Sequence, residues 1–308
     1  TPPIAGKIGD RFRFKDGHRI PIISSGISFA AMIFMAVAFT LFSNPGEIFK
    51  WILPVLIVLW LVSMSIFTSP ALSTLELFTP IDKLPRAMAI LTIVANLIYS
   101  LEPVIVDLID YLGAPVTFML GGVITFASGY ALKKNSLSLF NSKGQQPRAE
   151  IRFDTQRSDY FFILFMGMAL GLTTTLLFNY LPDLLQVNLA NIITWEGKWI
   201  LVSVLFITAV LSLPASDFIN KIGTHKSFWL SFLTNSVALA LLFVTGSGWL
   251  TIVILLVYTA SFTVLSVSSL PLAIEKANYY EKVFCVGIFF SGVALPDGIV
   301  EVFQAMNA

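Results

Sequence analysis

Two acidic residues lie inside long apolar stretches of the sequence. Glu102 stands in "NLIYSLEPVIVDLID" and Asp297 in "GVALPDGIVEVF", and each is next to a proline. An acid at mid-helix in a membrane costs about 2.5 to 3.5 kcal/mol on insertion, which makes it a functional candidate by default. A carboxylate that faces an aqueous cavity can carry a proton or help to bind sodium, and a proline frees backbone carbonyls that suit an ion site. We therefore expect both acids to bind a coupling cation or a substrate. The alternative is that their helices end earlier, so that both acids lie at the membrane interface.

Polar neighbours accompany the first of these acids. Asn96, Tyr99 and Glu102 recur at three-residue spacing, so on one helix they share a polar stripe. Asn96 and Tyr99 therefore join the candidate coupling or substrate residues.

Enzymatic and metal chemistry lack the residues they need. His18 and His225 lie in predicted loops and Cys285 is the single cysteine, so a metal or Cys/His catalytic site has nothing to be built from. No Gly-x4-Gly-Lys-Ser/Thr motif is present, so no ATP motor is predicted. The net charge of +1 argues against a nucleic-acid partner. We expect neither an enzyme nor a cofactor.

The elements that position these residues are membrane-spanning helices. The chain has 308 residues, of which 56 % are apolar and 12 % charged, and its mean hydropathy is +0.83. A spanning helix needs about 20 mostly apolar residues, and nine runs meet or approach this length. They are too long and unbroken for membrane β-strands, so an all-α membrane protein is predicted. The runs cover residues 22–42, 51–70, 87–106, 114–132, 160–181, 199–214, 227–244, 249–272 and 283–303.

The positive charges predict the orientation in the membrane. Loops between consecutive spans alternate sides, and 17 of the 19 Lys and Arg residues fall in loops of one parity, with only Lys50 and Lys198 in the others. Cytoplasmic loops carry the excess of Lys and Arg, so the first set is expected in the cytoplasm. The loop from Gly6 to Pro21 and a polar linker at 133–158 are therefore predicted to be cytoplasmic.

Two pairs of similar sequence segments indicate an internal repeat. The stretch "SDFINKIGTHKSFW" from Ser216 repeats the theme of "GKIGDRFRFKDGHRIP" from Gly6, with an acid after a span and then Gly, His and a basic residue. Two spans later, "SPALSTLE" and "LPLAIEK" both place a proline, an apolar turn and then a glutamate near a helix end. A parallel repeat of one helical bundle explains both pairs.

The stretch "GKIGDRFRFKDGHRIP" resembles the signature loop between the second and third helices of the major facilitator superfamily. The shared pattern is a Gly, three residues, Asp, a basic residue, and then Gly with further basic residues. The finer spacing is similar to that of the glycoside-pentoside-hexuronide and sucrose transporter branch. His18 and Ile20 depart from the denser basic run of that branch, and Leu213 stands where the second copy would have its leading Gly.

The resemblance implies a major facilitator fold of two pseudo-repeated six-helix bundles. The nine spans would then be helices 3 to 11 of 12, with two helices expected before them and one after. The domains implied are a partial N-terminal bundle at 1–132, the linker at 133–158 and a partial C-terminal bundle at 159–308. In this superfamily helix seven lines the cavity, which adds Asn179 and Tyr180 to the candidate substrate residues, although helix packing is an equal reading of the polar stripe on this helix.

The charged loop itself predicts a cytoplasmic gate. Asp10, at a helix end, can accept hydrogen bonds from the N-terminus of another helix, where the macrodipole favours a negative charge by roughly 0.3 to 1 kcal/mol. Arg11 and Arg19 can pair with carboxylates when the cytoplasmic face closes. The alternative is a solvated loop that only sets topology. The predicted gate motif comprises Gly6, Asp10, Arg11, Gly17, Arg19, Asp217, Gly223 and Lys226, and its predicted partners are Glu76, Asp82, Arg86 and Glu275.

These features predict a secondary active transporter that works by alternating access. The expected partners are a small polar solute such as a sugar or glycoside, a coupling proton or sodium ion, and the lipid bilayer. Two alternatives stay open: a non-transporting assembly or pigment-handling factor of the same superfamily, and a lipid transporter, which the 27 Phe residues would tolerate.

Overall fold

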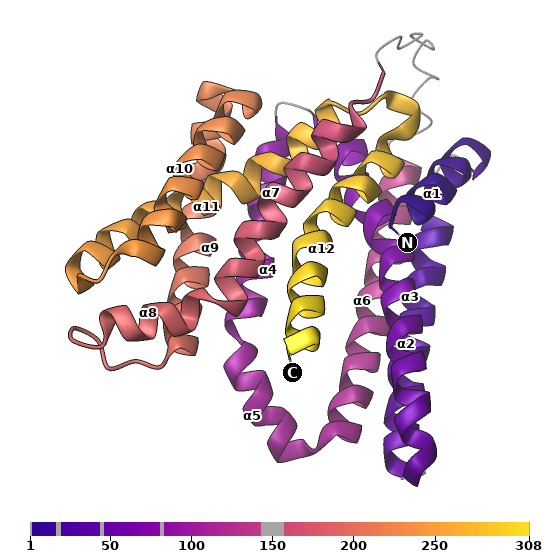
Figure 1. The fold of residues 1–308 in the computed structure, drawn as a ribbon. Helices are drawn as coiled ribbons and strands as arrows, with labels where there is room; N and C mark the ends of the chain where they lie inside the picture. Colours follow the sequence, from indigo (N-terminus) through magenta and orange to yellow (C-terminus); the bar gives the residue numbers. More distant parts are fainter. Residues whose placement is uncertain (1, 17–19, 44–45, 81–82, 143–156, 308) are drawn as a thin grey trace. The chain divides into compact units, whose positions relative to one another are not determined.

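The structure is a computed structural model that describes residues 2–16, 20–43, 46–80, 83–142 and 157–307 (Figure 1). These residues form helices joined by short connections, and they contain no strand. The helices are α1 (Pro2–Asp16), α2 (Ile20–Ser43), α3 (Phe49–Phe78), α4 (Leu84–Ser100), α5 (Glu102–Leu112), α6 (Ala114–Ser142), α7 (Tyr160–Asn179), α8 (Leu181–Leu189), α9 (Gly197–Ile222), α10 (Thr224–Val244), α11 (Gly248–Glu275) and α12 (Lys282–Asn307), with two short 3-10 helices, η1 (Gly46–Ile48) and η3 (Tyr279–Glu281).

Eight helices among the described residues are long and apolar enough to cross a membrane. A ninth span results if α4 and the end of α5 together make one crossing. The all-α, multi-pass prediction is therefore confirmed, and the protein is an integral membrane protein. The eight helices are α2, α3, α6, α7, α9, α10, α11 and α12.

The predicted span at 87–106 is wrong as a single continuous helix. Helix α4 ends at Ser100 and α5 begins at Glu102. Pro103 has no N–H to donate to the carbonyl of Tyr99, so the helical ladder cannot run through this point. The N–H of Leu101 instead bonds to the carbonyl oxygen of Ile98 at 3.1 Å. Glu102 thus begins a helix rather than lying inside one.

Three further boundaries differ from the prediction. Residues 2–16, expected as a loop from Gly6 onward, form α1, and α6 extends to Ser142, ten residues into the predicted linker at 133–158. The short helix α8 was not predicted. Its Leu181, Leu185 and Leu189 recur every four residues and are all buried, so it is an amphipathic helix whose periodicity is visible in the sequence.

The contacts divide the chain into two units. The first comprises Thr1–Thr74, Val104–Ser158 and Ala277–Gly287. Within it α2 packs along α6, and the ring of Phe34 lies against Trp60 and Phe118. The division into bundles at 1–132 and 159–308 stays a prediction.

The second unit comprises Leu75–Pro103, Asp159–Lys276 and Ile288–Ala308. Helix α4 packs against α9 and α11 through buried Ala89, Ile219 and Val267. The same unit holds an apolar core built from α7 to α11 around fully buried Tyr258, whose hydroxyl donates to the carbonyl of Thr173 at 3.1 Å. This hydrogen bond satisfies a polar group that would be costly to bury alone, and it ties α11 to α7.

Candidate functional site

Asp10 lies against the first turn of α12. Its Oδ2 accepts a hydrogen bond from the backbone N–H of Phe284 at 3.1 Å, and its Oδ1 accepts one from the N–H of Val283 at 3.4 Å. Asp10 is only 7 % exposed. Both N–H groups belong to the first turn of α12, which begins at Lys282, and the helix dipole favours a negative charge there. The carboxylate and the helix end therefore satisfy each other.

Gly6 lets α1 come this close to α12. A Cβ atom at position 6 would lie 2.5 Å from the carbonyl oxygen of Val283 and 2.8 Å from the Cα of Phe284. Both atoms belong to backbone and cannot rotate away. The same closeness recurs four residues after Val283, at Gly287, where a Cβ would lie 2.5 Å from the carbonyl oxygen of Pro2. Helices α1 and α12 are thus in backbone contact at both glycines.

The arginines and carboxylates predicted around Asp10 form no ion pair among the residues that the structure describes. Arg11, Arg86 and Glu275 are exposed. The side chain of Glu76 and the residues Gly17, Arg19 and Asp82 lie outside the described part.

The second copy of the motif is built differently. Helix α9 runs on to Ile222, and Gly223, with φ of +94°, turns the chain directly into α10. A positive φ of this size favours glycine. Asp217 and Lys226 are exposed, and no described residue donates a hydrogen bond to Asp217. Among the described residues Asp217 thus lacks the buried helix-end contact that Asp10 makes, and the gate role of Asp217, Gly223 and Lys226 stays a prediction.

A second polar site lies where α7 ends. Asn179 Nδ2 donates a hydrogen bond to Asp297 Oδ1 at 3.2 Å, which joins α7 to α12. Both side chains are exposed. The sequence named both residues as candidates, and the structure brings them together.

Glycines hold these two helices together. A Cβ atom at Gly167 would lie 2.1 Å from the carbonyl oxygen of Phe289, one at Gly171 would lie 2.2 Å from that of Val293, and one at Gly292 would lie 2.4 Å from that of Leu164. Small residues allow such close approach of helices in membranes. The glycines therefore fix the register that places Asn179 beside Asp297.

Of the other candidate residues, Asn96 and Tyr99 lie on α4. Asn96 is buried, and the ring of Tyr99 packs edge-on against Phe178 with 5.7 Å between the ring centroids. Phe178 immediately precedes Asn179, so Tyr99 approaches the same end of α7. Tyr180 forms the C-cap of α7 and is 40 % exposed. The side chain of Glu102 lies outside the described residues.

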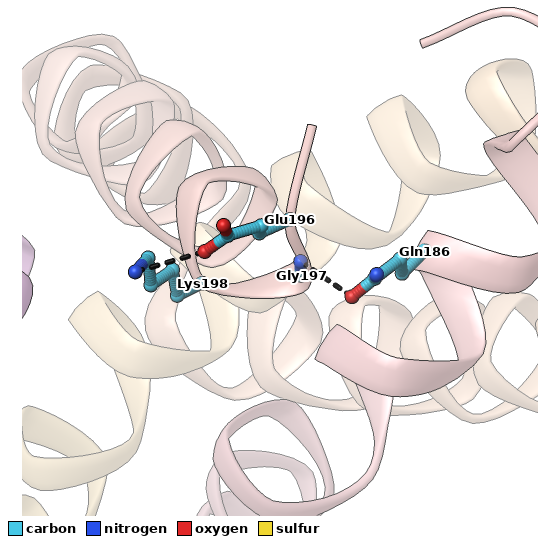
Figure 2. A network of polar contacts seen from close by, with 4 residues as sticks. All are labelled: Gln186, Glu196, Gly197 and Lys198. Carbon is cyan, nitrogen blue, oxygen red and sulfur yellow. Dashed lines mark hydrogen bonds and ion pairs between the residues drawn. The ribbon is translucent and has the colours of Figure 1, made fainter. Parts of the chain in front are cut away.

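The connection after α7 contributes residues that the sequence did not single out (Figure 2). Gln186 of α8 accepts a hydrogen bond through Oε1 from the N–H of Gly197 at 2.9 Å, and so satisfies a free donor at the start of α9. Beside it, Lys198 Nζ and Glu196 Oε2 form an exposed ion pair at 2.8 Å. A Cβ at Gly197 would lie 2.5 Å from the carbonyl oxygen of Pro182. Helix α8 is thus fixed to α9, which holds the end of α7 that carries Asn179.

The hydroxyl groups on α7 serve the helix itself. Thr173 and Thr174 both donate to the carbonyl of Leu170, at 2.9 and 2.8 Å. Asn235 of α10 is fully buried and donates to the carbonyl of Tyr258 and to Ser261 Oγ of α11, both at 3.4 Å. Asn235 therefore holds α10 to α11, as polar residues commonly do in membranes.

One family model, that of the Major Facilitator Superfamily, matches residues 1–296. A comparison with curated proteins found no match. The family match covers nearly the whole chain, and it agrees with the many apolar spanning helices and with the motif around Asp10. The chain therefore belongs to the major facilitator superfamily of membrane transporters.

Proposed function

We propose that this protein is a secondary active transporter that moves a small polar solute by alternating access, with a proton or sodium ion as the coupling cation. The contact of Asp10 with the first turn of α12 carries the proposal. It joins a residue of the predicted N-terminal bundle to a helix of the predicted C-terminal bundle through two hydrogen bonds. Such a contact can form in one conformation and break in another, which is what a gate requires. We call it the Asp10 latch.

We assign the solute or its coupling cation to the pair Asn179–Asp297. A carboxylate and an amide together offer several acceptors and donors, which suit the hydroxyl groups of a sugar or glycoside, and a carboxylate also suits a cation. The exposed ring of Tyr99, which packs on Phe178 beside Asn179, adds an apolar surface of the kind that sugar rings contact.

The test is uptake by the full-length protein in proteoliposomes. A panel of sugars and glycosides is offered with imposed proton or sodium gradients, and the wild type is compared with Asp297→Asn and Asn179→Ala. We expect uptake of one solute class that depends on one ion, and a loss of at least tenfold in Asp297→Asn. The matched control is Asp183→Asn, which changes an acid on α8 that takes part in neither proposed site.

A negative uptake result would contradict the proposal. If folded, correctly inserted protein transports nothing across the panel under either gradient, the proposal is wrong. Retention of lipid through purification, or co-purification of a partner protein, would then favour the lipid transporter or the accessory factor.

A further inference from the structure

Ser158 joins the end of the predicted linker to the loop that precedes α12. The backbone N–H of Asn278 donates to Ser158 Oγ at 2.8 Å, and Ser158 Oγ donates to Glu281 Oε2 at 3.0 Å. One hydroxyl therefore uses both its acceptor and its donor on the same loop, 120 and 123 residues further along the chain. We call these two hydrogen bonds the Ser158 clasp.

The two hydrogen bonds of the Ser158 clasp contact both ends of η3. Asn278 is the N-cap of this short helix, where its Oδ1 accepts from the N–H of Tyr280 at 2.9 Å, and Glu281 is its last residue. The N–H of Glu281 also bonds to the carbonyl of Asn278 at 3.0 Å, which closes the turn. Since Lys282 begins α12, the clasp fixes the residues from which this helix starts.

The Asp10 latch lies on the very next residues. Val283 and Phe284, which donate to Asp10, follow Glu281 by two and three positions. Cys285, the residue after Phe284, is fully buried at the start of the same helix. The latch donors Val283 and Phe284 thus lie within one helical turn of Glu281, the acceptor of the clasp.

We infer that Ser158 is a positioning residue for the Asp10 latch, and that it couples the end of the linker to the gate. By fixing η3, Ser158 sets the direction in which the first N–H groups of α12 point toward Asp10. This inference rests on the proposed latch. It goes beyond it by assigning a residue from the linker, 148 positions after Asp10 in the chain, to the closing of the gate.

The buried thiol of Cys285 gives a direct readout. Full-length protein in proteoliposomes is treated with N-ethylmaleimide, and modification of Cys285 is followed by peptide mass spectrometry. We compare wild type, Ser158→Ala, Ser158→Thr, Asp10→Asn and the double variant Ser158→Ala/Asp10→Asn. Ser203→Ala is the matched control, because Ser203 is exposed and bonds only to the carbonyl of Trp199 in its own helix.

We expect Ser158→Ala to raise the rate of Cys285 labelling about tenfold, as the loss of a hydrogen bond to a charged group allows. Ser158→Thr retains the hydroxyl and should label like the wild type, as should Ser203→Ala. The double variant should label no faster than Asp10→Asn alone, because both changes open the same contact. Glu281→Gln weakens the same hydrogen bond from the other side and replaces Ser158→Ala if that variant does not fold.

The outcomes separate the two proposals. If Asp10→Asn speeds labelling and the clasp variants do not, Ser158 has no positioning role and the latch stands. If the two changes add independently, the clasp acts on something other than the latch and the inference is wrong. If neither change alters labelling, both the latch and the clasp are wrong.

Discussion

Asp10 and Asp297, both singled out by the sequence, meet different partners in the structure. Asp10 is nearly buried and accepts hydrogen bonds from two backbone N–H groups of a helix end. Asp297 is exposed and accepts one from the side-chain amide of Asn179. A buried charge depends strongly on its partners, whereas an exposed one is free to exchange them with water or solute. This difference supports the proposed role of Asp10 in the gate and of Asp297 in binding the solute or the ion.

Replacing the charge of Asp10 should loosen the latch. Asp10→Asn keeps the shape of the side chain but removes the charge that the α12 dipole favours and weakens two charge-assisted hydrogen bonds, a loss of about 1.5 to 3 kcal/mol. The expected result is a fluctuating α1–α12 contact and at least tenfold faster modification of Cys285 by N-ethylmaleimide. Asp217→Asn, at the exposed acid of the second motif copy, is the control and should leave the rate unchanged. Equal rates in all three proteins would show that Asp10 does not hold the turn.

The sequence indicates which side chains donate or accept hydrogen bonds, but not which of them pair with one another. The rule that a carboxylate favours a helix N-terminus predicts the kind of partner that Asp10 has. That this partner is α12 depends on a contact across more than 270 residues, which no local pattern encodes. The pair Asn179–Asp297 and the role of Ser158 depend in the same way on tertiary packing.

Close helix contacts at glycine determine the arrangement at the element scale. Gly6 brings α1 onto the first turn of α12, and Gly167 and Gly171 bring α7 onto its later turns. The span boundaries follow from hydropathy and were largely predictable. The break before α5 follows from Pro103, and α8 from its leucine periodicity, but α1 was missed because its charged residues give no apolar run. The predicted linker begins too early, because α6 continues beyond the end of its own apolar run.

A methyl group at position 6 should separate α1 from α12. Gly6→Ala places a Cβ within 2.5 Å of a backbone oxygen, which costs about 1 to 3 kcal/mol unless the helices move apart. We expect faster proteolysis or thiol modification around Cys285 and a lower melting temperature in detergent. Gly298→Ala is the matched control, because nothing lies within 4 Å of a Cβ at that position of α12. A variant at position 6 that behaves like this control would contradict the close contact.

The α7–α12 contact makes a parallel prediction for the proposed binding site. Gly171→Ala would place a Cβ 2.2 Å from the carbonyl oxygen of Val293, so the two helices must shift and Asn179 must move away from Asp297. We expect solute uptake to fall at least tenfold while Cys285 labelling stays at the wild-type rate. If Cys285 labelling became faster while uptake fell, the Asn179–Asp297 site and the Asp10 latch would not be separate sites.

The excess of Lys and Arg in alternate loops predicts how the whole molecule is oriented in the membrane, and it agrees with membership of the major facilitator superfamily. The bias predicts that the loop after α9 is cytoplasmic and that the loop before it is on the other side. In a Cys285→Ser background, Trp195→Cys should therefore react with a membrane-impermeant maleimide in right-side-out vesicles. His225→Cys should react only after permeabilisation. Both residues are exposed, so a reversed pattern would overturn the orientation rather than reflect burial.

The latch is tested most directly by the distance between α1 and the start of α12. Spin labels at Lys7→Cys and Tyr280→Cys, both exposed positions, are introduced in the Cys285→Ser protein, and the distance distribution is measured by pulsed electron paramagnetic resonance in lipid nanodiscs. We expect a dominant short distance when Asp10 is present, and a new, longer population when Asp10→Asn is added. A distribution that is identical with and without Asp10→Asn would contradict the claim that Asp10 holds a gate closed.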